Sequence, residues 1–268
     1  MISSHSIIIN SSPVCYWSGI WSNNHTILVL HGRWWSSASR KKVLEWYVSL
    51  GYSVFVPDLP GFGNTPLPYP FAIEDYARRV QQFIDQISIP SHHKITILWH
   101  SNGGRIAVYA IIQHIIRCDS LILNNAAGIP IPPKRWARIF AYPKKLVFWW
   151  WKYILSCFPF VSKIREYFYR FLGWHDYLEA EKNPILKETF LNMLKTTYSD
   201  DVYAQIKVPT LVLWWEYDTY TPLRMGQKIS LLVPHSTFVL CSGQKHGIHL
   251  TDPNRIVNET NDFILQNF

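Results

Sequence analysis

Short apolar runs alternate with longer stretches of helical periodicity along most of the chain. The apolar runs predict strands at residues 26–32, 53–58, 95–100, 120–126, 209–215 and 236–242, after a hairpin-like opening within residues 5–18. Apolar positions at helical spacing predict helices at residues 36–50, 72–87, 103–116, 222–232 and 253–267. Strands separated by helices form βαβ units. We therefore expect an α/β fold with a mostly parallel central sheet and helices on both faces.

The alternation stops between residues 128 and 205. No strand is predicted there, the stretch IPIPP at residues 129–133 opens it irregularly, and several helical patterns follow. We therefore expect a core formed by residues 1–127 and 206–268, with a helical insertion at residues 128–205.

Three residues of complementary chemistry follow predicted strands, in the order Ser, Asp, His. Ser101 lies in WHSNG, between an apolar strand and a helix, while Asp218 and His246 come after two later strands. The carboxyl ends of parallel strands meet at one edge of a sheet, so these side chains should lie close together. A serine hydroxyl becomes a nucleophile only with a base in reach, and an acid behind a histidine fixes its tautomer.

Several motifs resemble those of the serine α/β-hydrolases. The WHSNG stretch is similar to the nucleophile elbow G-x-S-x-G, with Trp99 at the first glycine, and Ser-Asp-His is the chain order of that fold. The stretch TILVLHGR at residues 26–33 resembles the strand and His-Gly loop of the oxyanion hole, and VFVPDLPGFGNT at residues 54–65 resembles the D-L-P-G-F-G-x-S loop. The resemblance implies the α/β-hydrolase fold, with residues 128–205 as a helical cap over the active site.

The same resemblance implies a role for each site residue. Ser101 would be the nucleophile, His246 the general base and acid, and Asp218 the acid that orients the imidazole. The backbone N–H groups of Arg33 and Asn102 would form the oxyanion hole.

The expected substrate is a small hydrophobic carboxylic ester, because the insertion is rich in aromatic residues. Trp34, Phe148 and Tyr153 are the candidates for binding it. Thioesters, lactones and vinylogous C–C bonds are compatible with the same three residues. We expect no cofactor and no metal.

Other side chains could compete for the role of the acid. Glu216 lies two residues before Asp218, but it is closer to the strand and has a bulky neighbour on each side. Some members of the fold place the acid after the strand that ends near residue 125. This chain has Asn124 and Asn125 there, which are not carboxylates, so Asp218 is favoured.

The remaining histidines are better explained without a metal. His249 follows His246 by three residues, a spacing that can hold a metal ion. The preferred interpretation is that His249 lines the pocket or caps the helix that follows. His92 and His93 belong to a polar loop and are expected to be solvated.

The positive charge of the chain is concentrated in one segment. Residues 134–170 contain one acid, Glu166, and these basic residues: Lys134, Arg135, Arg138, Lys144, Lys145, Lys152, Lys163, Arg165 and Arg170. Their excess equals the formal net charge of +8, so the rest of the chain is about neutral. We favour solvated basic side chains on the outside of the cap. Weak contact with an anionic membrane surface is the alternative, and nucleic acid is not an expected partner.

Tryptophan occupies positions where related motifs have glycine. Trp34, Trp35, Trp99 and Trp215 stand at such turns, and the chain has 13 Trp against 12 Gly. Average usage of about 7% would give roughly 19 glycines. One interpretation is an aromatic-walled pocket, or an obstructed site in a catalytically impaired protein that only binds ligands. The other is that the gene uses UGA as a glycine codon, so that these four residues are misread glycines.

Two features of the sequence indicate the cellular compartment of the protein. The first residues lack a basic segment followed by a long apolar run, so we expect no signal peptide. Cys15, Cys118, Cys157 and Cys241 are isolated from one another, which is typical of reduced cysteines in a cytoplasmic protein. A disulfide framework is the alternative. The oligomeric state is not predicted.

Overall fold

A computed structural model describes residues 2–21, 23–32, 41–131, 180–181, 183–244, 246 and 252–268. These residues form an eight-stranded sheet in the order β1-β2-β4-β3-β5-β6-β7-β8. The strands are β1 (Ile2–Ile9), β2 (Ser12–Gly19), β3 (His25–Leu30), β4 (Ser53–Pro57), β5 (Lys94–His100), β6 (Ser120–Asn124), β7 (Thr210–Trp215) and β8 (Ser236–Cys241). From β4 to β8 in this order all neighbours are parallel, which confirms the predicted mostly parallel sheet.

The opening hairpin was also predicted correctly. Strands β1 and β2 are antiparallel, and β2 pairs in turn with β4. The connecting residues Asn10 and Ser11 have φ of 50° and 61°. Two-residue hairpin turns favour positive φ at both positions, and asparagine tolerates it better than most residues.

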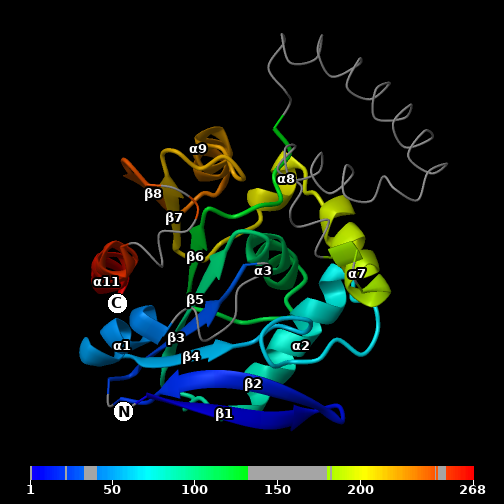
Figure 1. Cartoon of the computed structure of the whole chain (residues 1–268). Helices are drawn as coiled ribbons and strands as arrows, with labels where there is room; N and C mark the ends of the chain where they lie inside the picture. Colours follow the sequence, from blue (N-terminus) through cyan, green and yellow to red (C-terminus); the bar gives the residue numbers. More distant parts are fainter. Residues whose placement is uncertain are drawn as a thin grey trace, which may run out of the picture.

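Helices cover both faces of the sheet (Figure 1). They are α1 (Lys41–Ser49), α2 (Ile73–Gln86), α3 (Gly103–Ile112), α9 (Leu223–Leu232) and α11 (Pro253–Asn267). Helices α1 and α11 pack on one face, and α2, α3 and α9 on the other. Alternate residues of β3 enter the two cores, with Ile27 in one and Leu28 in the other. Burial on both faces explains why these strands are apolar throughout.

Some predicted elements are longer than those found. Strand β6 ends at Asn124, not at residue 126, because Asn125 has φ of 45° and leaves the extended conformation. Helix α3 ends at Ile112, not at residue 116, and His114 has φ of 52°. Asparagine and histidine are among the non-glycine residues that enter the left-handed region most readily.

The long segment between β6 and β7 joins two neighbouring strands of the sheet. Its described part contains α7 (Pro184–Lys195) and α8 (Asp200–Tyr203). The side chain of Asn183 accepts from the N–H groups of Ile185 and Leu186, which caps the start of α7. Residues 132–179 and residue 182 lie outside the described residues, so the cap and its boundaries at residues 128–205 stay predictions.

Two further observations concern the described residues alone. None of their helices has the length and apolar character needed to cross a membrane. The described cysteines, Cys15, Cys118 and Cys241, are all free thiols.

Candidate active site

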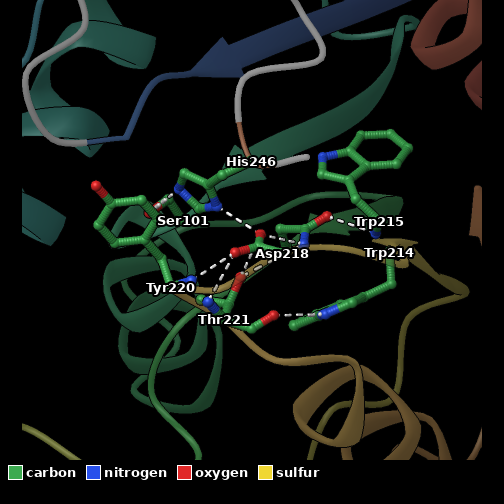
Figure 2. A network of polar contacts seen from close by, with 8 residues as sticks. Ser101, Trp214, Trp215, Asp218, Tyr220, Thr221 and His246 are labelled. Carbon is green, nitrogen blue, oxygen red and sulfur yellow. Dashed lines mark hydrogen bonds and ion pairs between the residues drawn. The ribbon is translucent and has the colours of Figure 1, made fainter. Parts of the chain in front are cut away.

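Ser101, Asp218 and His246 converge at the carboxyl ends of the parallel strands (Figure 2). Ser101 follows β5, Asp218 follows β7 and His246 follows β8. The Nε2 atom of His246 lies 3.0 Å from the Oγ of Ser101, and its Nδ1 atom lies 2.5 Å from Oδ2 of Asp218. The structure thus brings together the three residues that the sequence singled out.

The backbone at Ser101 makes a sharp turn between β5 and α3. Ser101 has φ of 55°, a left-handed conformation that non-glycine residues rarely adopt. Its carbonyl oxygen accepts from the N–H groups of Ala127 at 2.8 Å and Gly104 at 2.9 Å. These bonds hold the strained turn in place, so the hydroxyl stays directed at His246.

The oxyanion-hole prediction lies partly inside the described residues. Asn102 is the N-cap of α3, where backbone N–H groups have no acceptor within the helix and the dipole favours negative charge. Gly32 lies so close that a Cβ on it would be 2.9 Å from the Cβ of Ser101. Only glycine lets the His-Gly loop approach the serine in this way. Arg33, the next residue, lies outside the described residues and remains a prediction.

His31 fixes this loop, although the sequence analysis gave it no role. Its Nε2 atom accepts from the N–H of Leu59 at 2.9 Å, so Nδ1 carries the proton and donates to the carbonyl oxygen of Gly32 at 2.7 Å. The bond to Leu59 ties the His-Gly loop to the DLPGFG segment. The two motifs are therefore one physical unit beside Ser101.

Asp218 is a buried carboxylate that accepts hydrogen bonds from several donors. Oδ1 accepts from the N–H groups of Tyr220 and Thr221, and Oδ2 accepts from the Thr221 hydroxyl and from Asn125 Nδ2 in addition to facing His246. Burial by itself raises the pKa of Asp218. The hydrogen bonds from His246 and Thr221, with the charge of His246, outweigh burial and hold that pKa below its ordinary value.

The imidazole of His246 also contacts two aromatic rings. The ring of His100 lies 4.7 Å away between centroids, and the ring of Tyr220 lies 5.1 Å away. Figure 2 shows the Tyr220 ring beside His246 and Ser101. Tyr220 is 57% exposed, so its ring lies at the surface of the site. Sequence reasoning missed Tyr220, although its position two residues after the acid was a signal.

The alternative residues lie elsewhere or are used differently. The carboxylate of Glu216 accepts from the N–H of Gly243 at 3.0 Å and is not the partner of His246. His92 is exposed as expected, whereas His93 is half-buried, and its Nδ1 atom lies 3.0 Å from the Thr26 hydroxyl. His249 lies outside the described residues.

The tryptophans of the motif set differ in their surroundings. Trp99 and Trp215 are wholly buried, on opposite faces of the sheet. Trp214, which is not at a glycine position, donates its ring N–H to the carbonyl oxygen of Thr221 at 2.9 Å. Trp34 and the other predicted substrate-binding residues, Phe148 and Tyr153, lie outside the described residues, as does Trp35.

Comparison with known proteins agrees with this geometry. Protein ABHD8 of Homo sapiens is 22% identical over 245 residues, which cover 89% of this chain and 55% of that protein. Lipase 1 of Psychrobacter immobilis is 24% identical over 215 residues, covering 73% of this chain and 63% of the lipase. The chain therefore spans about half the length of the first relative and less than two-thirds of the second.

The fold is shared with solved structures as well. A putative lipase (lip1) from Acinetobacter baumannii AYE superposes with a TM-score of 0.73 at 23% identity, covering 99% of this chain and 92% of the lipase. The family model described as alpha/beta hydrolase family matches residues 27–260, from β3 into α11. The chain belongs to the alpha/beta hydrolase family.

Proposed function

We propose that the protein is a serine hydrolase that cleaves a carboxylic ester of a small hydrophobic molecule through an acyl-enzyme. The observation that carries the proposal is the continuous contact from Ser101 through His246 to Asp218, at 3.0 Å and 2.5 Å. Both distances are within hydrogen-bond reach, so the base can take the serine proton without any rearrangement.

The chemistry follows from these contacts. The Ser101 oxygen attacks the carbonyl carbon of the ester while Nε2 of His246 takes the hydroxyl proton. The tetrahedral intermediate collapses, the C–O bond to the alcohol breaks, and His246 returns the proton to the departing oxygen. A water molecule then attacks the acyl-enzyme while His246 takes one of its protons. The bond between the acyl carbon and the Ser101 oxygen breaks, His246 returns the proton to Ser101, and the carboxylic acid leaves.

Asp218 and the first turn of α3 would stabilise the charges that form. The carboxylate of Asp218 stabilises the imidazolium and keeps the Nδ1 proton directed toward itself. The N–H groups of Asn102 and Arg33 are the proposed donors to the oxyanion. Losing one such donor typically lowers the rate on the order of 10²- to 10³-fold.

The substrate class is argued from the similar proteins and from the composition of the chain. Two of the similar proteins are named as lipases, which favours an ester with a hydrophobic part. The aromatic residues of the insertion, Phe148 and Tyr153 among them, are the proposed acyl-binding wall. The same three residues would also act on a thioester or a lactone.

A fluorophosphonate probe tests the proposal directly, because it forms a covalent bond only with an activated serine. We expect stoichiometric labelling of the wild-type protein at Ser101, hydrolysis of short p-nitrophenyl esters, and neither in Ser101→Ala. Asp218→Asn should keep the fold and lose rate on the order of 10⁴-fold.

The opposite result is equally informative. Folded wild-type protein that neither reacts with the probe nor cleaves any ester would contradict the proposal. It would favour the catalytically impaired binding protein instead. Labelling at another serine would refute the assignment of Ser101.

A further inference from the structure

Asn125 links the end of β6 to the carboxylate of Asp218. Its side chain is wholly buried, although it directly follows the last residue of a central strand. The amide Nδ2 donates to Oδ2 of Asp218 at 2.5 Å, and at 3.4 Å it also faces the hydroxyl of Thr221. The amide oxygen accepts from the backbone N–H of Trp215 at 3.1 Å. One side chain thus contacts both the last residue of β7 and the acid that follows it.

Few residue types could make these contacts from this position. Asn125 has φ of 45°, and its backbone N–H donates to the carbonyl oxygen of Leu213 at 3.0 Å. Among small residues, a left-handed conformation is tolerated by glycine, asparagine and aspartate. Of these, glycine has no side chain, and an ionised aspartate can accept from Trp215 but cannot donate to Asp218. Asparagine alone among them supplies the donor and the acceptor together.

The oxygen that Asn125 contacts is the one that faces the imidazole. Oδ2 of Asp218 lies 2.5 Å from Nδ1 of His246, whereas Oδ1 is held by the N–H groups of Tyr220 and Thr221. Tyr220 and Thr221 belong to the same loop as Asp218 and would move with it. Apart from His246 itself, Asn125 is the side-chain donor among the described residues that connects this carboxylate to another part of the sheet, the end of β6.

We propose that Asn125 is a positioning residue that holds Oδ2 of Asp218 in line with Nδ1 of His246, a role that rests on the proposed function. It does so by anchoring the carboxylate to the end of β6, next to β5, the strand that Ser101 follows. The donated hydrogen bond also favours the ionised carboxylate that the imidazolium needs. The positions of Ser101 and Asp218 are thereby fixed by two adjacent strands, and not by two independent loops.

Two substitutions separate positioning from simple packing. In Asn125→Ala both hydrogen bonds are lost, and we expect kcat to fall about 10- to 100-fold, the range for losing one bond to a charged group. KM should stay unchanged because no substrate contact is removed. Asn125→Asp keeps the size, the left-handed tolerance and the acceptor for Trp215. Two carboxyls in contact raise the pKa of the pair, so the new carboxyl donates to Asp218 while it holds its proton and becomes a like charge once it ionises. Relative to wild type, the kcat of Asn125→Asp should therefore fall as the pH rises, to at least the level of Asn125→Ala once both carboxyls are ionised.

The relative kcat values of the two variants distinguish positioning from packing. If Asn125 only fills space and supports the backbone, the isosteric Asn125→Asp should keep wild-type kcat at every pH and Asn125→Ala should be the worse variant throughout. That order, or an unchanged kcat in both, would overturn the proposal. Rates are expressed per site, counted by labelling with the fluorophosphonate to completion, so that poorly folded protein does not enter the comparison.

Asn124→Ala is the matched control. Asn124 is the preceding residue, equally buried, and its side-chain amide has no hydrogen-bond partner among the described residues. Its removal should leave kcat at the wild-type level. If wild-type protein is not labelled at all, the proposed function fails. If wild type and Asn125→Ala react equally fast with the fluorophosphonate, only the proposed role of Asn125 fails.

Discussion

The buried tryptophans next to the site differ in whether their polar atom has a partner. The ring N–H of Trp214 reaches the carbonyl oxygen of Thr221. Those of Trp99 and Trp215 are buried without a partner among the described residues. An orphaned buried donor costs about 1–3 kcal/mol. The two indoles with this defect are the two described ones that occupy glycine positions of the family motifs.

This coincidence supports the misread-codon hypothesis, which makes one prediction about the gene and one about Trp99. We expect TGA at codons 34, 35, 99 and 215, and we expect Trp99→Gly to leave the protein at least as stable in urea unfolding. Trp214→Gly is the control. Its ring packs on Gly226 and its N–H is bonded, so removing it should cost about 3–5 kcal/mol.

Two results would contradict the misread-codon hypothesis. One is TGG at the four codons. The other is a loss of several kcal/mol on Trp99→Gly, which would mean that the indole is a native part of the core. In that case Gly103 has to be glycine, because a Cβ on it would lie 2.9 Å from the Trp99 ring.

At the scale of elements, α3, the helix that follows Ser101, is bonded to the segment between β6 and β7. The guanidinium of Arg105 in α3 donates to the carbonyl oxygens of Met193 at 3.2 Å and Thr196 at 2.5 Å, where α7 ends. In return the Tyr198 hydroxyl donates to the carbonyl oxygen of Arg105 at 2.7 Å. The last carbonyls of a helix lack partners within it, so a cation is favourable there.

Removing this cation should loosen α7 and α8 before the rest of the described fold. We expect Arg105→Ala to lose about 1.5–3 kcal/mol of stability, the range for hydrogen bonds to a charged group. Hydrogen exchange should accelerate first in α7 and α8. Arg78→Ala is the control, because its ion pair with Glu74 is exposed and lies on α2. Equal protection of α7 in wild type and Arg105→Ala would show that the contact does not hold the helix.

The sequence was sufficient to predict those elements whose hydrophobic pattern follows from their burial. Alternate residues of β3 face two cores, and that alone makes the strand apolar and recognisable. The serine was found because its turn resembles the nucleophile elbow, and the acid and the histidine because they follow later predicted strands in the chain order of that family. Asn125 was considered only as a missing carboxylate. Its bond to Asp218 spans 93 residues of chain, and no local pattern records which distant group an amide will meet.

At the scale of the whole molecule, a second polar chain crosses the opposite end of the sheet from the site. Nε2 of His25 lies 2.7 Å from the hydroxyl of Thr96, which lies 2.7 Å from that of Ser120. These residues come from the starts of β3, β5 and β6. The His25 ring also meets the ring of Phe268 at the C-terminus, at 5.3 Å between centroids. Burial is the main reason that the pKa of His25 falls to about 4.

The pH dependence of stability follows from this shift. Between its unperturbed value of 6.5 and about 4, the unfolded chain binds a proton at His25 and the folded protein does not. The unfolded state is therefore favoured as the pH falls through this window, and the effect is complete below about 4. In urea unfolding at several pH values, we expect the wild type to lose stability more steeply than His25→Gln. His235→Gln, at an exposed position, should follow the wild-type curve. If the stability of wild type and of His25→Gln changed in parallel with pH, this pH dependence would not be due to His25.

The placement of the long β6–β7 segment between neighbouring strands has an evolutionary consequence. Strands β6 and β7 pair directly, whatever the length of chain between Asn124 and Thr210. The entropy needed to close such a loop grows only with the logarithm of its length, by about 0.6 kcal/mol for each doubling. Insertions of very different size can therefore be exchanged at this point while the sheet keeps its register. A lineage can therefore vary this segment without rebuilding the serine, the histidine and the carboxylate.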